Sequence, residues 1–165
     1  MTAHRGILLA QLDEHKAKAF EIIQRGDVHL APGAVADPPV LSQSRWELIR
    51  IMSAYQAFKR YELFDPAIRG ADREKAQLAE KMKAECVAIA DDFRAHVARC
   101  ANLDIPKHWD AYRPAVAKLL ARIKVHMSRE RWLIETKLLG PESGPAARRA
   151  YGTSTVSFAS SRRSG

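Results

Sequence analysis

His126 and Glu130 could do chemistry together, because they stand four residues apart in a stretch that reads as a helix. Residues at that spacing lie on the same face of a helix, one turn apart. An imidazole and a carboxylate placed in this way can hydrogen-bond each other or bind one metal ion together. Both also follow the predicted inward-facing stripe of residues 107–139, whose other members are Trp109, Tyr112, Val116, Leu119, Ile123 and Leu133. The sequence therefore predicts a polar pair on the buried side of this helix.

Two further histidines, His15 and His96, fall on the core-facing stripes of two other predicted helices. Buried imidazoles need hydrogen-bond partners, and one interpretation is purely structural, with Glu130 as the partner of His126 and Asp92 as that of His96. The other interpretation is a metal site in the protein interior. In that case His15, His96, His126 and Glu130 hold one iron or another divalent metal ion. The residues alone leave both interpretations open.

Four amphipathic helices must position these side chains, and the periodicity places them at residues 5–25, 44–65, 72–101 and 104–139. Residues 27–41, with three prolines and no periodicity, predict an irregular connection. The boundary signals are Gly26 after the first helix, the capping box of Ser44 and Glu47, Asp65-Pro66 after the second, Asp72 before the third, and Pro106 at the start of the last. With no strand pattern and no internal repeat, the sequence predicts an all-α fold, an antiparallel up-down four-helix bundle.

Composition indicates one domain with a tail. The chain has 165 residues, of which 47% are apolar, and a net charge of +8. We expect a bundle domain over residues 1–140 and a disordered basic tail, rich in Ser, Gly and Arg, over residues 141–165. The excess charge is mild and no aromatic residues interleave with it, which disfavours nucleic acid as a partner. No apolar run is long enough for a signal peptide or a membrane span, so we expect a cytoplasmic protein without a membrane partner.

The sequence contains none of the motifs of common catalytic centres. Cys86 and Cys100 are fourteen residues apart on one predicted helix, roughly 21 Å along its axis, and cannot bridge each other. Both read as small core residues in a reducing compartment. There is no Gly-rich phosphate loop, no Cys-x-x-Cys, and no nucleophile beside a plausible base. The sequence therefore favours a protein that is not an enzyme.

Short motifs on all four helices resemble those of the hemerythrin-like, or HHE cation-binding, family. Residues 12–15 read Leu-Asp-Glu-His, like the entry of that family's first helix, and residues 61–68 read Tyr-Glu-Leu-Phe-Asp-Pro-Ala-Ile, like the corner after its second. His96 stands on the third helix, and His126 with Glu130 matches the histidine and glutamate of the fourth. The resemblance implies a four-helix bundle with iron bound in its interior.

The second helix departs from the family pattern. The family places a histidine and, four residues later, a glutamate before the corner, where this chain has Tyr55 and Lys59, or Gln56 and Arg60 one residue along. A lysine ammonium has no lone pair for a metal and repels a cation. The resemblance thus implies an incomplete di-iron site.

We therefore expect a regulatory or sensory module acting through protein–protein interaction, with another protein or a second copy of this chain as its partner. The alternative is a metal-binding protein that stores or senses iron, oxygen or nitric oxide. These two functions belong to different classes, and the sequence does not decide between them.

Overall fold

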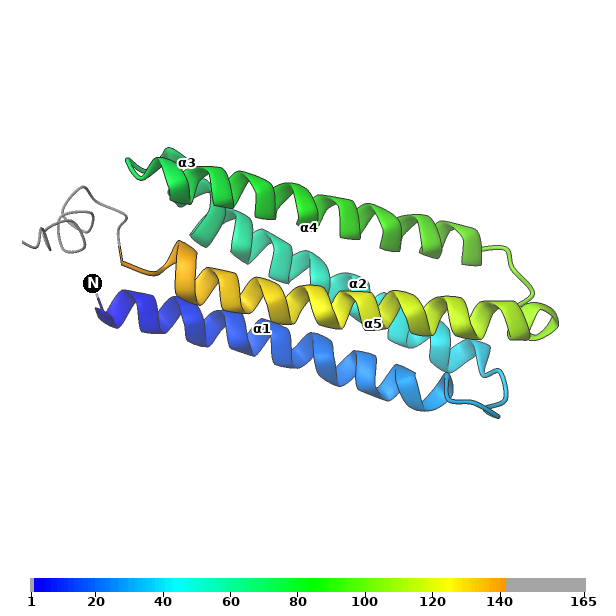
Figure 1. The fold of residues 1–165 in the computed structure, drawn as a ribbon. Helices are drawn as coiled ribbons and strands as arrows, with labels where there is room; N and C mark the ends of the chain where they lie inside the picture. The colour runs from blue at the N-terminus through cyan, green and yellow to red at the C-terminus, as the bar shows by residue number, and fades with distance from the viewer. Residues whose placement is uncertain (1, 142–165) are drawn as a thin grey trace, which may run out of the picture.

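The computed structural model describes residues 2–141, and within this range the chain is helical, with no strand. The four long helices are α1 (Thr2–His29), α2 (Pro38–Phe58), α4 (Arg73–Cys100) and α5 (Trp109–Leu133). They lie side by side, and the colour gradient of Figure 1 shows that successive long helices run in opposite directions along the molecule. The predicted tail lies outside the described residues from residue 142 on, so its disorder and the domain boundary at residue 140 stay predictions.

Shorter helical segments link or extend the long helices. A π-helical segment, η1 (Lys59–Phe64), continues α2 and leads into the short α3 (Asp65–Arg69). A 3₁₀ turn, η2 (Pro106–His108), precedes α5, and a second π-helical segment, η3 (Ile134–Leu138), ends it. In Figure 1, α3, the start of α1 and the end of η3 all lie at the same end of the molecule.

Two of the wrongly predicted boundaries arise because a stronger signal or tertiary packing overrides the local pattern. Gly26 does not end the first helix, which continues to His29, and Gly26 is buried with Leu120 as its neighbour. The second helix begins at Pro38 rather than at Ser44, because the Asp37 side chain accepts a hydrogen bond from the backbone N–H of Val40, and prolines favour the first helical positions. The irregular connection is therefore shorter than predicted.

The helix predicted to stop at Asp65-Pro66 instead runs on to Arg69 through η1 and α3. Pro66 falls within the first turn of α3, where a missing N–H costs little. The predicted cap of the third helix is confirmed, since the Asp72 carboxylate accepts hydrogen bonds from the backbone N–H groups of Glu74 and Lys75, both at 3.1 Å. Pro114 lies inside α5.

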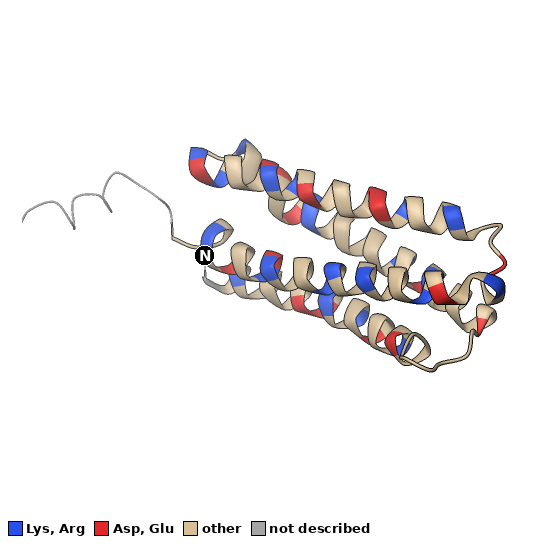
Figure 2. Ribbon diagram, turned by 45° about the vertical axis from the view of Figure 1, so that its right-hand side comes forward, with Lys and Arg blue, Asp and Glu red and all other residues tan. Residues whose placement is uncertain are grey.

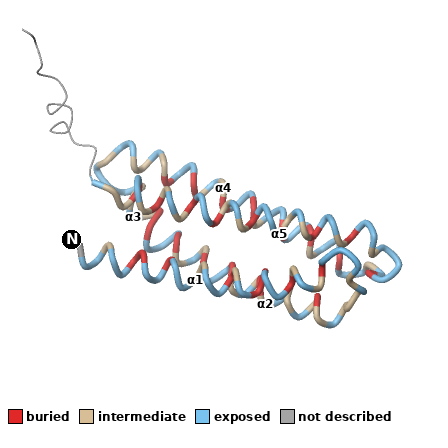
Figure 3. Tube along the Cα trace, turned by 60° about the horizontal axis from the view of Figure 1, so that its bottom comes forward, coloured by how far each residue is buried: buried red, intermediate tan, exposed pale blue. Residues whose placement is uncertain are grey.

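The core runs along the molecule between the facing sides of the four helices, as Figure 3 shows. On α4 the core-facing stripe on which His96 was expected is buried from Met82 to Cys100. Along α5 and at the start of η3, some buried positions lie one residue later in the sequence than predicted. Leu120 and Met127 on α5 and Ile134 at the start of η3 are buried, whereas the predicted Leu119, His126 and Leu133 are half-buried beside them. His126 therefore lies at the margin of the core.

The surface of the described helices mixes charges of both signs. In the view of Figure 2, Lys and Arg alternate with Asp and Glu along the long helices. None of the helices in residues 2–141 is both long and apolar enough to cross a lipid bilayer.

Candidate functional site

A buried ion pair between Lys59 and Glu130 lies in the core of the bundle. Lys59 is the first residue of η1, and Glu130 lies on α5 one turn before η3 begins. The ammonium Nζ is 2.8 Å from each carboxylate oxygen, and both side chains are 2% exposed. π-Helical turns are rare and often mark functional positions. Here each member of the pair is at or next to one.

Two more side chains complete the bonding of the Glu130 carboxylate. The Tyr55 hydroxyl donates a hydrogen bond to Oε2 at 2.9 Å, and the Cys86 thiol donates one to Oε1 at 2.8 Å. The Lys59 ammonium also lies 3.2 Å from the Cys86 sulfur and 4.0 Å from the centre of the Tyr55 ring. Across the part of the chain that the structure describes, no buried side-chain nitrogen or oxygen lacks a hydrogen-bond partner. We call Tyr55, Lys59, Cys86 and Glu130 the buried polar cluster.

The charges within the cluster balance at neutral pH. Burial alone would raise the pKa of Glu130, but the Lys59 charge, the hydrogen bonds from Cys86 and Lys59, and His126 together hold it below its usual value. Burial raises the pKa of the Cys86 thiol to about 12, with the Glu130 charge acting in the same direction and Lys59 opposing both. Burial and the neighbouring Glu130 also raise the pKa of the Tyr55 phenol. The thiol and the phenol therefore stay protonated beside one carboxylate and one ammonium.

His126 borders the cluster and contacts it through the Cys86 sulfur. Its Nε2 lies 3.7 Å from Glu130 Oε1, too far for the hydrogen bond that the spacing on the helix predicted, and 3.7 Å from the Cys86 sulfur. The side chain is 14% exposed, and partial burial lowers its pKa. On its outer side, His126 lines a surface hollow of about 280 Å³ between α4 and α5. The imidazole therefore separates the cluster from solvent.

His15 and His96 lie elsewhere. The His15 ring packs against the rings of Tyr55 and Phe58, with centroids 5.9 and 5.2 Å away. His96 lies 3.5 Å from the Cys100 sulfur. Its predicted partner Asp92 is instead bound by Arg122. The structure thus brings together His126 and Glu130, but not the four residues proposed as metal ligands.

Within residues 2–141, the group suited to a metal ion is Cys86, His126 and Glu130, whose ligand atoms lie within 4.8 Å of one another. Cys86 was predicted to be only a small core residue, and Lys59 only an obstacle to a metal. One signal was visible for Lys59: it continues the apolar stripe of Leu48, Met52 and Tyr55, and a charged residue in such a stripe usually has a buried partner.

A di-iron centre does not fit these residues. In the hemerythrin-like pattern such a centre takes a histidine and a bridging carboxylate from the second helix, whereas this chain has Tyr55 and Lys59 in that part. The lysine ammonium is already in contact with Glu130, the carboxylate that the fourth helix would supply. The incomplete di-iron site stays a prediction, and what the structure adds is an internal cation in contact with Glu130.

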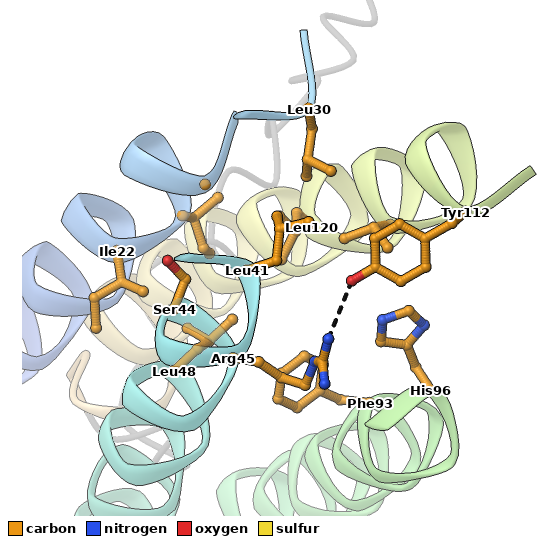
Figure 4. Close-up of a pocket in the computed structure, with 13 residues that line it drawn as sticks. Ile22, Leu30, Leu41, Ser44, Arg45, Leu48, Phe93, His96, Tyr112 and Leu120 are labelled. Atoms are coloured by element: carbon orange, nitrogen blue, oxygen red, sulfur yellow. Dashed lines mark hydrogen bonds between the residues drawn. The ribbon is translucent and has the colours of Figure 1, made fainter. Parts of the chain in front are cut away.

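A small cavity lies toward the other end of the bundle, among α1, α2, α4 and α5 (Figure 4). The Arg45 guanidinium donates a hydrogen bond to the Tyr112 hydroxyl at 3.3 Å, and the His96 ring lies beside that tyrosine. The cavity volume of about 40 Å³ is close to that of one water molecule. It has no room for an organic substrate.

A larger groove opens between α2 and α4, with a volume of about 270 Å³. Its floor is apolar and reaches Phe93 and, on α5, Ile123. Ile49 lines its wall, and Trp46, 64% exposed, stands one turn before Ile49 on the same side of α2. Exposed apolar surface beside an apolar groove is typical of a contact site.

The chain matches no protein-family model, and neither a curated protein nor a solved structure matches it. Its function must therefore be inferred from the fold and from the chemistry of these residues.

Proposed function

We propose that this protein is a non-enzymatic regulatory or sensory module, an antiparallel up-down four-helix bundle of the hemerythrin-like type that acts in the cytoplasm through protein–protein interaction. The Lys59–Glu130 ion pair is the observation that carries this proposal. An internal ammonium next to the carboxylate makes a di-iron centre unfavourable. In this proposal the chain keeps the fold of the hemerythrin-like family without its metal centre.

The closed bonding of the buried polar cluster supports a role without catalysis. The Glu130 carboxylate is fully engaged by Lys59, Tyr55 and Cys86, and the thiol is held in its protonated, unreactive form. A general base or a nucleophile needs a free lone pair facing a substrate. None of these groups offers one.

The groove between α2 and α4 supports protein–protein interaction. A glutamate introduced at exposed Ala98, which lines the groove, should weaken a complex by placing a charge in an apolar contact. Ala17→Glu on the exposed surface of α1 is the matched control. Cross-linking with quantitative mass spectrometry should recover a partner less well with Ala98→Glu than with wild type or the control. Sedimentation should show whether that partner is a second copy. Equal recovery by all three proteins would refute the groove as the contact site.

Iron reconstitution tests the incomplete di-iron site. After anaerobic addition of ferrous iron and exposure to air, wild type should lack the near-ultraviolet absorption of an oxo-bridged iron pair. Two irons per chain with that absorption would overturn the proposal.

A second candidate function, metal binding, is favoured by one observation: the ligand atoms of Cys86, His126 and Glu130 converge. In the iron-binding form of this candidate, the protein stores or senses iron, oxygen or nitric oxide. Elemental analysis of protein produced in iron-supplemented medium tests it, with near-stoichiometric iron that is lost in His126→Ala as the supporting result. His96→Ala should then leave the iron content unchanged, since His96 lies apart from the other ligands.

A further inference from the structure

We propose that Cys86, His126 and Glu130 form a site for one thiophilic divalent ion of the zinc type, and that the Lys59 ammonium is the cation with which this ion competes. The inference rests on the second candidate function and names its ion class, its ligands and its regulation. It differs from an iron site of histidines and carboxylates, because a sulfur ligand replaces His15 and His96.

The three ligand atoms already have the spacing that such an ion requires. Cys86 Sγ and Glu130 Oε1 are 2.8 Å apart, and His126 Nε2 is 3.7 Å from each of them. A point about 2.0 Å from all three atoms exists within that triangle, by plane geometry, and zinc bonds to nitrogen, oxygen and sulfur measure about 2.0–2.3 Å. An ion slightly out of the plane therefore reaches all three ligands without movement of the backbone.

The ligands stand on rigid elements and have suitable chemistry. Cys86 comes from α4, and His126 and Glu130 come from consecutive turns of α5. Thiolate, imidazole and carboxylate together suit zinc or cobalt, whereas magnesium and calcium prefer sites made of oxygen alone. When the ion binds, the thiol proton leaves to solvent and a sulfur–metal bond replaces the S–H bond. A water molecule in the fourth position would have to enter past His126, which lines the hollow between α4 and α5.

Because Lys59 competes with the ion for Glu130, the site fills only when the ion is abundant. Its ammonium is 2.8 Å from the same Glu130 oxygen, so an ion bound about 2 Å from that oxygen would lie within about 5 Å of a positive charge. The ion must therefore displace Lys59 from the carboxylate, and its apparent affinity is reduced accordingly. Because Lys59 begins η1, which leads into α3, this displacement would carry a signal from the core to the end of the bundle.

Cobalt is the probe of choice, because a cobalt–thiolate bond absorbs in the near ultraviolet. Wild type titrated with Co²⁺ should develop this band with one ion per chain, and excess Zn²⁺ should abolish it. Cys86→Ala should lose the band, whereas Cys100→Ala, at the other buried cysteine, should keep it. The His96→Ala variant should also bind as wild type does.

Removal of the competing cation should tighten binding. Lys59→Met should bind Co²⁺ at least about tenfold more tightly than wild type, since a charge-free side chain no longer opposes the ion. Lys124→Met, which removes a lysine paired with Asp27 away from the cluster, should bind as wild type does. Lys59→Gln serves the same purpose if Lys59→Met does not fold, with circular dichroism as the measure of folding.

A folded wild type and a folded Lys59 variant that both lack the cobalt–thiolate band would overturn the inference. So would a band that survives in Cys86→Ala. Iron bound without the sulfur ligand would refute this site while leaving metal binding as a function. Loss of the partner complex in Ala98→Glu, by contrast, bears only on the interaction module.

Discussion

The Lys59–Glu130 pair should dominate the response of this protein to core mutations. Both side chains are 2% exposed and bonded at 2.8 Å, so removal of one partner leaves the other charged, buried and unpaired. Such a loss typically costs about 3–5 kcal/mol. We therefore expect Lys59→Met and Glu130→Gln each to lower the free energy of unfolding by about 3 kcal/mol or more. The glutamine keeps the side-chain shape and one acceptor oxygen, and it places an NH2 donor where the carboxylate had its second oxygen, so the change removes the charge together with one of the two acceptors used by Tyr55 and Cys86.

A double-mutant cycle measured by urea unfolding at neutral pH provides the test. The variant with both changes should be less destabilised than the sum of the single variants by at least about 2 kcal/mol, because it contains no orphaned charge. Lys124→Met breaks an ion pair whose side chains are 35% and 38% exposed, and should cost at most about 1 kcal/mol. Single losses below about 1 kcal/mol that add within about 0.5 kcal/mol would refute the reasoning.

Further changes should have distinct signatures. The native pKa of Glu130 lies below 4.5, so as the pH falls this carboxylate takes up its proton in the unfolded chain before it does so in the folded protein. The free energy of unfolding should therefore decrease below about pH 4.5. Acid unfolding should show a less steep decrease for Glu130→Gln than for wild type. Folding raises the pKa of Cys86 from 9.0 to about 12, so the contribution of the protonated thiol to the free energy of unfolding is complete below pH 9 and declines above it. Alkaline unfolding of Cys86→Ala should lack this decline. Gly26→Ala should raise the melting temperature by an amount equivalent to about 0.5–1 kcal/mol, because alanine favours the helix more than glycine does. There is room for the added Cβ, whose nearest neighbour would be Leu120 at 3.9 Å. An unchanged or lower melting temperature would indicate a clash. Asp72→Ala should cost about 1 kcal/mol in urea unfolding, because two backbone N–H groups of α4 lose their acceptor; no loss would show that solvent replaces the cap.

Helical periodicity predicted much of the fold, and the cleanest case is α4. Its stripe from Met82 to Cys100 is buried and its Asp72 cap forms, because both depend on residues close in sequence. The capping box at Ser44 failed where two start signals competed and Asp37, followed by two prolines, was stronger. Gly26 failed because the packing of α1 against its neighbours extends a helix past a residue that favours its end. The π-helical turns left no periodic signal.

The candidate site was predicted only in part, because its bonds join different helices. Glu130 was correctly placed in the core, but its partner was taken from its own helix. On α5 Met127 faces the core and His126 lies at its margin, one position away from the predicted register. Lys59, directly after the end of α2, contacts Glu130 instead. Steps of three and four residues do not distinguish such neighbouring positions. Nor does periodicity state which helices face one another.

The π-helical segment η1 has a consequence for residue insertion and deletion. Its geometry is visible in the hydrogen bond from the Asp65 N–H to the Arg60 carbonyl, five residues back. A segment of this kind accommodates one residue more than an α-helix of the same course. Deleting one residue from 60–64 would let the segment close as an ordinary α-helix, with Lys59 and its bond to Glu130 unmoved. An insertion or deletion in regular α2 would instead turn Lys59 by about 100° away from Glu130. The protein thus carries a place next to its ion pair where chain length can change without disturbing that pair.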